Sequence, residues 1–541
     1  MKVVSVAQMR ALEAAAFAAG TSEAALQERA GRAAAEEVFR IAATGQRVVV
    51  LVGHGNNGRD GAVAAEWLLR RGTPVDLVLA PRHAVTTVEL GRLQALGAVV
   101  VPSVDGREVQ SALGRAGVAL DALAGIGARG ALREPLATLA RHLNAARHAL
   151  HVVALDLPSG IDADSGAVPG EAVWADTTVT LGGVKQGLLR FPAAERVGHL
   201  VGREIGIPET AERELQYAVV DETVLRSLIP ARPPDAHKYR FGRALIVAGS
   251  DHFLGAPVLC SGAAARVGAG LITVASTRDV RLNVAAHLAE VTFTEQDVRA
   301  SDGASAARAL ERYLNSHQSV VLGPGLGRGP ATTEFVAEVL RPRPGNHRLV
   351  IDADGLFALS ELGDWSARLG RDDVLTPHSG ELERLVGQEL SADEPLWVHA
   401  GRLARQWGCV LVAKGPFTCV AASTGQVEVW PRANPALATG GTGDVLAGII
   451  GGLLAQGVAT WDAARLGVGV HALAAERLVQ NRHWRTLLAS DLLEYLPAVL
   501  HELGSQPRSE AKEFWGAARR PRRPNNTPAY TREGLFVSRP G

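Results

Sequence analysis

Residues 47–61 read RVVVLVGHGNNGRDG, an unbroken apolar run that ends in a glycine-rich loop. Continuous rather than alternating apolar residues are typical of a parallel strand that is covered on both faces. Similar runs follow at 74–80, 98–101, 118–123, 151–158 and 177–182. We expect helices over 5–19, 22–42, 61–71 and 85–96. The alternation predicts a mostly parallel sheet with helices on both faces, a Rossmann-like three-layer α/β sandwich.

A second α/β series starts with FGRALIVAGS at residue 241 and runs to a glycine-rich helix start at 440. The bridge before it, roughly residues 210–236, is polar and contains the proline-rich stretch IPARPPD. The last 36 residues hold seven arginines and five prolines without an apolar period. We therefore predict two α/β domains, 1–215 and 216–505, and a disordered tail at 506–541.

The overall charge is balanced, with 56 lysines and arginines against 56 aspartates and glutamates. This balance argues against nucleic acid or a membrane surface as a partner. Three cysteines without a Cys-x-x-Cys spacing cannot form a disulfide framework or a zinc site. In the first 17 residues, the charges of Arg10 and Glu13 come before any apolar run is long enough for a signal peptide. We expect a cytoplasmic homo-oligomer that binds small molecules.

The loop GHGNNGRDG formally satisfies the dinucleotide fingerprint G-x-G-x-x-G. That fingerprint requires an acidic residue at the end of the next strand, whereas Asp76 stands at its start. Two adjacent amides and a carboxylate in a glycine-rich turn suit a polar ligand or a cation better. An Asx-rich turn that only begins a helix is the alternative.

Two later strand ends carry matching chemistry. Asp121 lies near the end of VALDAL, before the loop GIGARG, and Asp156 precedes the sharp turn Leu157-Pro158-Ser159-Gly160. Because the carboxyl ends of parallel strands meet at one edge, these loops and residues 53–61 are expected to converge on one crevice. Oxygens of Asn57, Asp121 and Ser159 suit a cation, and Asp156 is the better-placed acid or base. Ordinary caps and turns are the alternative interpretation.

The strongest pattern of the second half is NPALATGGTGDV at residues 434–445. Gly-x-Gly-Asp at a helix start offers backbone N–H groups and a positive helix end to a transferring phosphoryl group. Asp444, in the first turn, is then placed to act as a general base. Lys414-Gly415-Pro416-Phe417-Thr418, between two strands, suits nucleotide phosphates, although an ordinary hairpin turn would look similar. The strand-end loops at 320–329 and 350–355 are expected in the same crevice.

The N-terminal half resembles the NAD(P)H-hydrate epimerase domain family, whose three signatures match GHGNNGRDG, DALAGIG and LDLPSG; LQERAG at 26–31 extends the match over about 1–210. The resemblance implies that Asn57, Asp121 and Ser159 bind potassium and that Asp156 is catalytic. It implies a set of residues around the hydrated nucleotide: Asn56, Asn57, Gly58, Arg59, Asp60, Gly125, Ile126, Gly127, Ala128, Arg129, Gly130, Ala131 and Asp156. Arg59 stands where the family usually has glycine, and either tightens or obstructs phosphate binding.

The C-terminal half, over about 220–500, resembles the ribokinase-like fold and, within it, the ADP-dependent NAD(P)H-hydrate dehydratase family. The matches are HKYRFGRALIVAGS, KGPFT, NPALATGGTGD and PHSGE, with Tyr239 where the family has glycine and Ser379 where it usually has proline. The resemblance implies that Ala256, Gly325, His378 and Asp444 contact the hydrate. It implies that the adenine nucleotide is held by Lys414, Gly415, Pro416, Phe417, Thr418 and Gly443, with Mg²⁺ accompanying ADP.

The order of the two halves is that of bifunctional NAD(P)H-hydrate repair enzymes. The resemblance implies epimerisation of the R and S hydrates and ADP-dependent dehydration of the S hydrate, which restores NAD(P)H and releases AMP and phosphate. The alternative is a ribokinase-like kinase of a small vitamin precursor, fused to a non-catalytic binding domain. The preference between NADH and NADPH hydrates, and the strictness for ADP over ATP, do not follow from the sequence.

Overall fold

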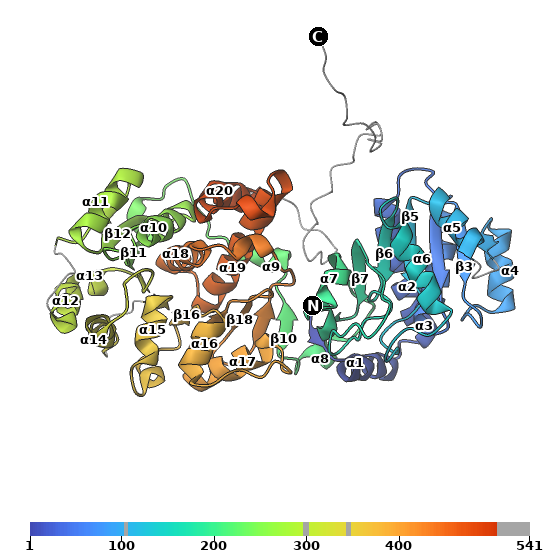
Figure 1. Ribbon diagram of the computed structural model, residues 1–541, viewed down its shortest axis with the longest axis horizontal. Coiled ribbons are helices and arrows are strands. Elements are labelled where there is room, and N and C mark those ends of the chain that lie inside the picture. The colour runs from blue at the N-terminus through green and yellow to red at the C-terminus, as the bar shows by residue number, and fades with distance from the viewer. Residues whose placement is uncertain (102–105, 296–301, 342–347, 506–541) are drawn as a thin grey trace, which may run out of the picture.

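The computed structural model describes residues 1–101, 106–295, 302–341 and 348–505, and the predicted tail at 506–541 lies outside these ranges. Figure 1 shows two lobes side by side, each built around its own sheet. The prediction of two α/β units is confirmed, because each sheet is mainly parallel and carries helices on its faces.

The N-terminal half holds a seven-stranded, all-parallel sheet in the order β4-β3-β2-β5-β6-β7-β9. Its strands are β2 (Val48–Val52), β3 (Val75–Leu79), β4 (Val99–Val101), β5 (Val118–Ala122), β6 (His151–Leu155), β7 (Thr177–Leu181) and β9 (His199–Arg203). The chain builds β2, β3 and β4 outward and then returns to place β5 beside β2. This reversal opens a crevice at the carboxyl ends of β2 and β5, where open α/β sheets bind ligands.

The helices of this half are α1 (Val6–Ala18), α2 (Glu23–Ile41), α3 (Asn56–Arg70), α4 (Thr87–Ala95), α5 (Gly106–Arg115), α6 (Leu136–Ala146), α7 (Ala194–Val197) and α8 (Glu209–Glu212). The short strands β1 (Val3–Val4) and β8 (Val184–Lys185) pair with each other. The predicted start of the third helix at residue 61 is wrong, because α3 begins at Asn56. The two asparagines therefore lie in its first turn.

The C-terminal half holds a ten-stranded sheet in the order β10-β19-β18-β17-β16-β15-β14-β11-β12-β13. Its strands are β10 (Tyr217–Val219), β11 (Arg243–Val247), β12 (Leu271–Ala275), β13 (Thr292–Phe293), β14 (Ser319–Leu322), β15 (Arg348–Ile351), β16 (Val374–Leu375), β17 (Val410–Ala413), β18 (Cys419–Ala421) and β19 (Val427–Val429). Only β18 runs antiparallel to its neighbours. A second reversal lies between β11 and β14.

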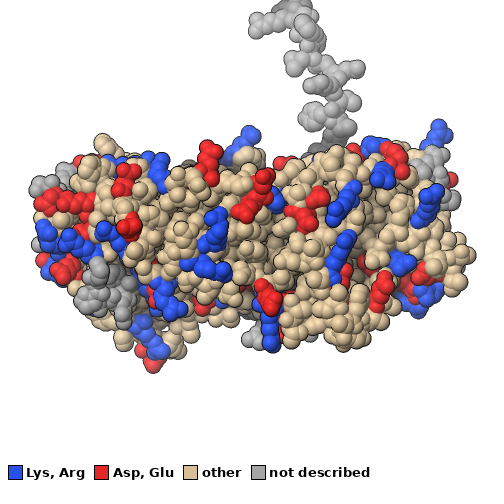
Figure 2. All heavy atoms as spheres, turned by 90° about the horizontal axis from the view of Figure 1, so that it is seen from below, with Lys and Arg blue, Asp and Glu red and all other residues tan. Residues whose placement is uncertain are grey.

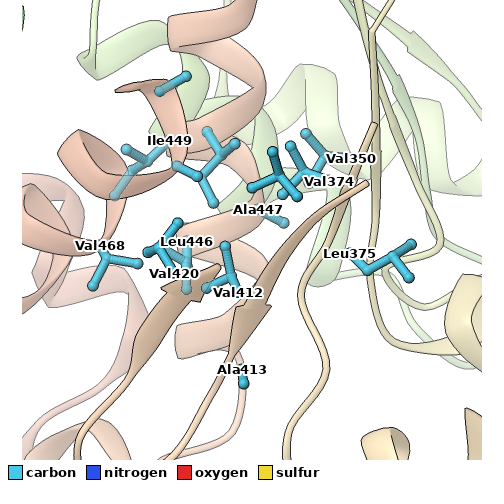
Figure 3. Close-up of a cluster of buried hydrophobic side chains, with 14 of the residues drawn as sticks. Val350, Val374, Leu375, Val412, Ala413, Val420, Leu446, Ala447, Ile449 and Val468 are labelled. Carbon is cyan, nitrogen blue, oxygen red and sulfur yellow. The ribbon is translucent and has the colours of Figure 1, made fainter. Parts of the chain in front are cut away.

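The helices of this half are α9 (Glu222–Leu228), α10 (Ala256–Arg266), α11 (Arg278–His287), α12 (Gly303–Ala309), α13 (Glu311–Ser316), α14 (Pro330–Val339), α15 (Asp354–Ser360), α16 (Ser379–Val386), α17 (Leu396–Trp407), α18 (Thr442–Ala455), α19 (Thr460–Asn481) and α20 (Ala489–Ser505). Apolar residues of α18 and α19 pack on the strands around β15–β18 (Figure 3). A Cβ atom at Gly448 of α18 would lie 2.2 Å from the Cys260 carbonyl oxygen of α10. The glycine thus lets α18 approach α10 closely, and this packing fixes the helix start that carries Asp444.

The described surface carries charges of both signs. Figure 2 shows acidic and basic side chains interspersed over one face of the molecule. Among the described residues, we find no helix with the length and hydropathy needed to cross a membrane.

Candidate active sites

A cavity of about 690 Å³ opens at the carboxyl ends of β2 and β5, with α1 and α2 as one wall. Eight of the residues predicted to bind the hydrate line it: Asn56, Asn57, Asp60, Gly125, Ile126, Gly127, Ala128 and Asp156. The other five do not line it: Gly58, Arg59, Arg129, Gly130 and Ala131. The Arg59 side chain is 51% exposed and lies 4.0 Å from Glu23. The arginine therefore points to the rim of the site.

The predicted cation ligands gather beneath this cavity. Ser159 donates hydrogen bonds to both carboxylate oxygens of Asp121, from its backbone N–H at 2.8 Å and from its hydroxyl at 2.7 Å. The hydroxyl also receives a 2.9 Å bond from the Ala124 N–H. The Asn57 side chain lies against Gly125, the residue after Ala124, since a Cβ atom at Gly125 would be 3.3–3.4 Å from the Asn57 amide.

The electrostatics of this set suit a cation of low charge. Asp121 is wholly buried, and desolvation raises the pKa of its carboxyl from 3.8 to about 6 despite the hydrogen bonds from Ser159. The amide nitrogen of Asn57 is buried without a hydrogen-bond partner. The described part of the chain offers no cluster of three His, Cys, Asp or Glu side chains for a metal. A cation here would therefore depend on one carboxylate together with amide, hydroxyl and backbone oxygens, a donor set that fits K⁺.

The predicted acid or base of this half, Asp156, directly follows β6 in a left-handed conformation with φ of 69°. Its carboxylate accepts a hydrogen bond from the Lys185 ammonium and one of 3.3 Å from the Leu181 N–H. The lysine is 1% exposed and also donates to the Leu181 carbonyl at 2.7 Å. Strained backbone of this kind is typical of functional sites. The paired lysine holds the Asp156 carboxylate in place at the cavity wall.

Two further carboxyls face Asp156 across the cavity. Burial, with the negative charges of Asp156 and Glu13, raises the pKa of Asp60 from 3.8 to about 8. One oxygen of Asp60 is buried without a hydrogen-bond partner. Burial also raises the pKa of Glu13 on α1. At neutral pH Asp60 thus carries a proton that it can donate, while Asp156 stays paired with a lysine.

The sequence analysis missed Lys185, Glu13 and four other polar residues of the cavity, Arg10, Glu23, Gln27 and His54. His54 lies within the quoted loop and was given no role. Lys185 is the second residue of the two-residue strand β8, 29 residues after its partner, so no local pattern indicates the pair. Its one usable signal is a lysine within the otherwise apolar and glycine-rich segment LGGVKQGLL.

The second site surrounds the start of α18. Asp444 lies in the first turn of the helix, after Gly441 in a left-handed conformation with φ of 91°. Burial and the negative charge of Asp352 raise the pKa of Asp444 from 3.8 to about 7, although Lys414 opposes the shift. The Lys414 ammonium lies 2.8 Å from Asp352 and 3.9 Å from Glu381. A Cβ atom at Gly443 would lie 3.3 Å from the same ammonium.

The predicted residues His378 and Lys414 lie on neighbouring strand ends. An isolated bridge joins their backbones, with Lys414 N–H donating to the Pro377 carbonyl at 2.8 Å. His378 caps α16, since its ring nitrogen Nδ1 accepts a 3.1 Å bond from the Gly380 N–H. Its side chain is exposed, with Nε2 3.4 Å from Glu381. The structure therefore brings His378, Lys414, Gly443 and Asp444 to one edge.

The remaining predicted residues flank this centre on two sides. Gly325 has a φ of 64°, and a Cβ atom there would lie 3.2 Å from the Ala256 Cβ, so these two are neighbours. In the turn Gly415–Thr418, the Thr418 hydroxyl donates to the Gly415 carbonyl at 3.1 Å. Pro416 lies at the exposed tip of this turn. Phe417 is buried and packs against Phe191 of the N-terminal half, with ring centroids 5.8 Å apart.

The sequence analysis placed the loop 350–355 in this crevice without giving its residues roles. The Asp352 carboxylate pairs with the Lys414 ammonium and also accepts a 2.8 Å hydrogen bond from the Thr376 hydroxyl. Ala353 has a φ of 50°, and Asp354 accepts hydrogen bonds from Arg328 at 3.0 Å and Gly327 N–H at 2.9 Å. This loop therefore supplies the negative charge that acts on Asp444.

Comparisons with known proteins match both halves. Residues 23–187 match the family described as "YjeF-related protein N-terminus", and residues 244–498 match "NAD(P)H-hydrate dehydratase". The chain is similar to the bifunctional NAD(P)H-hydrate repair enzyme Nnr of Salinibacter ruber, at 36% identity over 90% of this chain and 93% of the relative. The enzyme of the same name from Moorella thermoacetica is 36% identical over 88% and 92%. Among solved structures, the ADP/ATP-dependent NAD(P)H-hydrate dehydratase from Bacillus subtilis is 30% identical over 53% of this chain and 98% of that chain, with a TM-score of 0.47.

Proposed function

Since the chain belongs to the family of bifunctional NAD(P)H-hydrate repair enzymes, we propose that it repairs hydrated NADH and NADPH with one active site in each half. The observation that carries this proposal is the match along both halves, together with a polar site at the carboxyl ends of parallel strands in each sheet. The alternative, a vitamin-precursor kinase with an inert N-terminal domain, leaves the N-terminal cavity and its carboxyl cluster without a role.

The C-terminal half dehydrates the S hydrate. The Asp444 carboxylate accepts the proton of the C6 hydroxyl as the hydroxyl oxygen bonds to the β-phosphorus of ADP and the bond to AMP breaks. The Lys414 ammonium and the N–H groups at the start of α18 stabilise the charge on the phosphoryl group in flight. The ring nitrogen lone pair then expels phosphate from C6, a proton leaves C5, and NAD(P)H is restored.

The magnesium that we propose for this half arrives with ADP. The neighbouring carboxylates are already engaged, Asp352 by Lys414 and Thr376, and Asp354 by Arg328. The phosphates of ADP, rather than a dedicated protein cage, are therefore expected to hold the ion, as is common for Mg²⁺. Lys414, Gly415, Pro416, Phe417, Thr418 and Gly443 would bind the nucleotide, and Ala256, Gly325 and His378 the hydrate.

The N-terminal half interconverts the R and S hydrates. The protonated Asp60 carboxyl and the lysine-paired Asp156 carboxylate face one cavity, so one group can donate a proton to the departing C6 oxygen and the other can take one from returning water. Asn57, Asp121 and Ser159 would hold K⁺, which supplies positive charge beneath the substrate. Lys185 positions Asp156 and keeps its charge compensated.

Three further points are proposals about the chain as a whole. We place the domain boundary near residue 215, since β9 at Arg203 belongs to one sheet and β10 at Tyr217 to the other. The cytoplasmic location and the homo-oligomeric state remain predictions.

The deciding experiment incubates the full chain with mixed R and S hydrates of NADH and with ADP or ATP, and follows the absorbance of the reduced nicotinamide. We expect ADP-dependent recovery of nearly all the NADH in one fast phase. A stable phosphate ester without recovered NADH would favour the kinase alternative. Recovery of the S fraction alone would remove the epimerase half of the proposal.

A further inference from the structure

A second cavity, of about 440 Å³, lies in the C-terminal half at the carboxyl ends of β11, β12 and β14. It occupies the second switch point, between β11 and β14, where open α/β sheets bind ligands. Its volume is in the range of about 300–1,000 Å³ that small-molecule sites share. Figure 1 shows β11, β12 and α11 at the end of this half that lies away from the N-terminal half.

The lining has an apolar and a polar part. Ala275, Ala306 and Phe335 form the apolar part, which suits a flat ring. The polar part includes the hydroxyls of Ser250 and Thr277, and both oxygens are buried without a hydrogen-bond partner. Buried hydroxyls are paired in most proteins, so two unpaired ones on residues that line one cavity indicate a polar ligand.

The start of α11 adds donors to the polar part. Thr277 is the N-cap residue of this ten-residue helix, yet its side chain makes no capping hydrogen bond. The first N–H groups of a helix and its positive end favour anions, and phosphates are bound there in many α/β proteins. Arg328, whose guanidinium pairs with Asp354, also lines the cavity. Phosphate oxygens are therefore the expected partners of the two hydroxyls.

The cavity begins where the proposed hydrate site ends. Leu326 on its rim follows Gly325, and a Cβ atom at Gly325 would lie 2.6 Å from Phe253, another lining residue. From β15 at the catalytic centre to β12 there are three strand spacings, or about 14 Å. An extended dinucleotide bridges such a distance between its two rings.

We propose that this cavity binds the adenosine diphosphate arm of the hydrated dinucleotide, with the adenine ring against Phe335 and the diphosphate at Ser250, Thr277 and the start of α11. The inference rests on the proposed function and extends it to the half of the substrate that does not react. Free ADP, the second substrate, carries the same chemical group, so the test must separate the two occupants.

The test compares two substrates with the full chain: the S hydrate of NADH and the S hydrate of reduced nicotinamide mononucleotide, which lacks the adenylate. The ratio of their kcat/KM values measures what the arm contributes. We expect this ratio to be well above ten for the wild type and to fall about three- to tenfold in Ser250→Ala and in Thr277→Val, the loss typical of one hydrogen bond. Thr333→Val, on α14 but outside the cavity lining, is the matched control and should leave the ratio unchanged.

A blocking variant gives a second measurement. Ala331 is exposed at the cavity mouth, so Ala331→Trp can narrow the site without disturbing the core. It should raise KM for the NADH hydrate at least tenfold while KM for ADP stays constant. Equal loss with both hydrates, or an increase in KM for ADP alone, would overturn the inference. Failure to turn over either hydrate would instead contradict the proposed function.

Discussion

Replacing Asp444 by asparagine removes the proposed base of dehydration while keeping a side chain of nearly the same size at the start of α18. General-base assistance typically contributes about 10²- to 10⁴-fold, so we expect the rate with the S hydrate and ADP to fall by at least 10²-fold. The structure also predicts the pH dependence of the wild type. Because the pKa of Asp444 is raised to about 7, only about one tenth of the molecules carry the charged base at pH 6.

The assay follows the absorbance of restored NADH from pH 5.5 to 9 for the wild type, Asp444→Asn and Asp462→Asn. Asp462 is a matched control, since it lies in the first turn of the next helix and pairs with Arg465 away from the site. The wild type and the control should lose activity as the pH falls through about 7, and Asp444→Asn should show no such limb. A flat wild-type profile below pH 7, or an asparagine variant with more than a tenth of normal activity, would refute the role of Asp444.

The raised pKa of Asp444 also makes the free energy of unfolding depend on pH. The folded-state pKa of Asp444 lies above its unfolded value, so the group favours folding fully below about pH 4 and loses that contribution as the pH rises through about 7. Above about pH 7 the wild type carries a buried negative charge at Asp444, and asparagine removes that charge. Thermal unfolding at pH 8 should therefore find Asp444→Asn at least as stable as the wild type, which separates lost chemistry from lost structure.

Asp156→Ala and Lys185→Met should each abolish enzymatic epimerisation but leave S-hydrate dehydration near normal. In early time courses with mixed hydrates, the R hydrate should then disappear only at the uncatalysed rate. Equally fast loss of the R and S hydrates in these variants would exclude this cavity as the epimerase site. Potassium chloride should raise the unfolding temperature more than tetramethylammonium chloride of equal ionic strength, and the difference should shrink at acid pH, because protonation of Asp121 competes with the cation. An Asp121→Asn variant that keeps the full difference would contradict the proposed ligand set. Phe191→Ala should raise KM for ADP about three- to tenfold with little change in kcat, because Phe191 packs on Phe417 of the nucleotide turn; an unchanged KM would mean that the N-terminal half does not support that turn.

The class of both sheets and the position of both crevices were predictable from the sequence. Runs such as VVVLV are apolar without alternation, and all five of these residues are buried in β2. Since parallel strands end at one edge, the segments that follow β2, β5 and β6 had to meet. The hydrogen bonds between Asp121 and Ser159 show that two of these loops do so.

The start of α3 was predicted five residues late for a physical reason. Asparagine and glycine have low helix propensity, so Asn56, Asn57 and Gly58 were assigned to a loop. In the structure, close packing of this segment outweighs its low helix propensity. A Cβ atom at Gly58 would lie 2.3 Å from the Gly53 carbonyl oxygen, so only glycine permits the helix to start this close to the strand end. The helical turn then directs Asn57 inward and leaves Arg59 exposed.

The charge pairs of the sites were not predictable. Lys185 and Asp156 are 29 residues apart, and Lys414 and Asp352 are 62 apart. Each partner belongs to a different strand or strand end, and neither spacing corresponds to a helix turn or a hairpin. Such pairs depend on which strands become neighbours, which one sequence does not specify.

These pairs show that two halves of unrelated sequence reach the same electrostatic arrangement. In each, a strand-end carboxylate is held by a lysine from a later strand, Asp156 by Lys185 and Asp352 by Lys414. In each, burial and the negative charge of that carboxylate raise the pKa of a second carboxyl, Asp60 to about 8 and Asp444 to about 7. The second carboxyl therefore exchanges its proton near neutral pH, as acid–base chemistry at a carbon-bound hydroxyl requires. In each site, therefore, a lysine is paired with one carboxylate and a second carboxyl beside it is available for proton transfer.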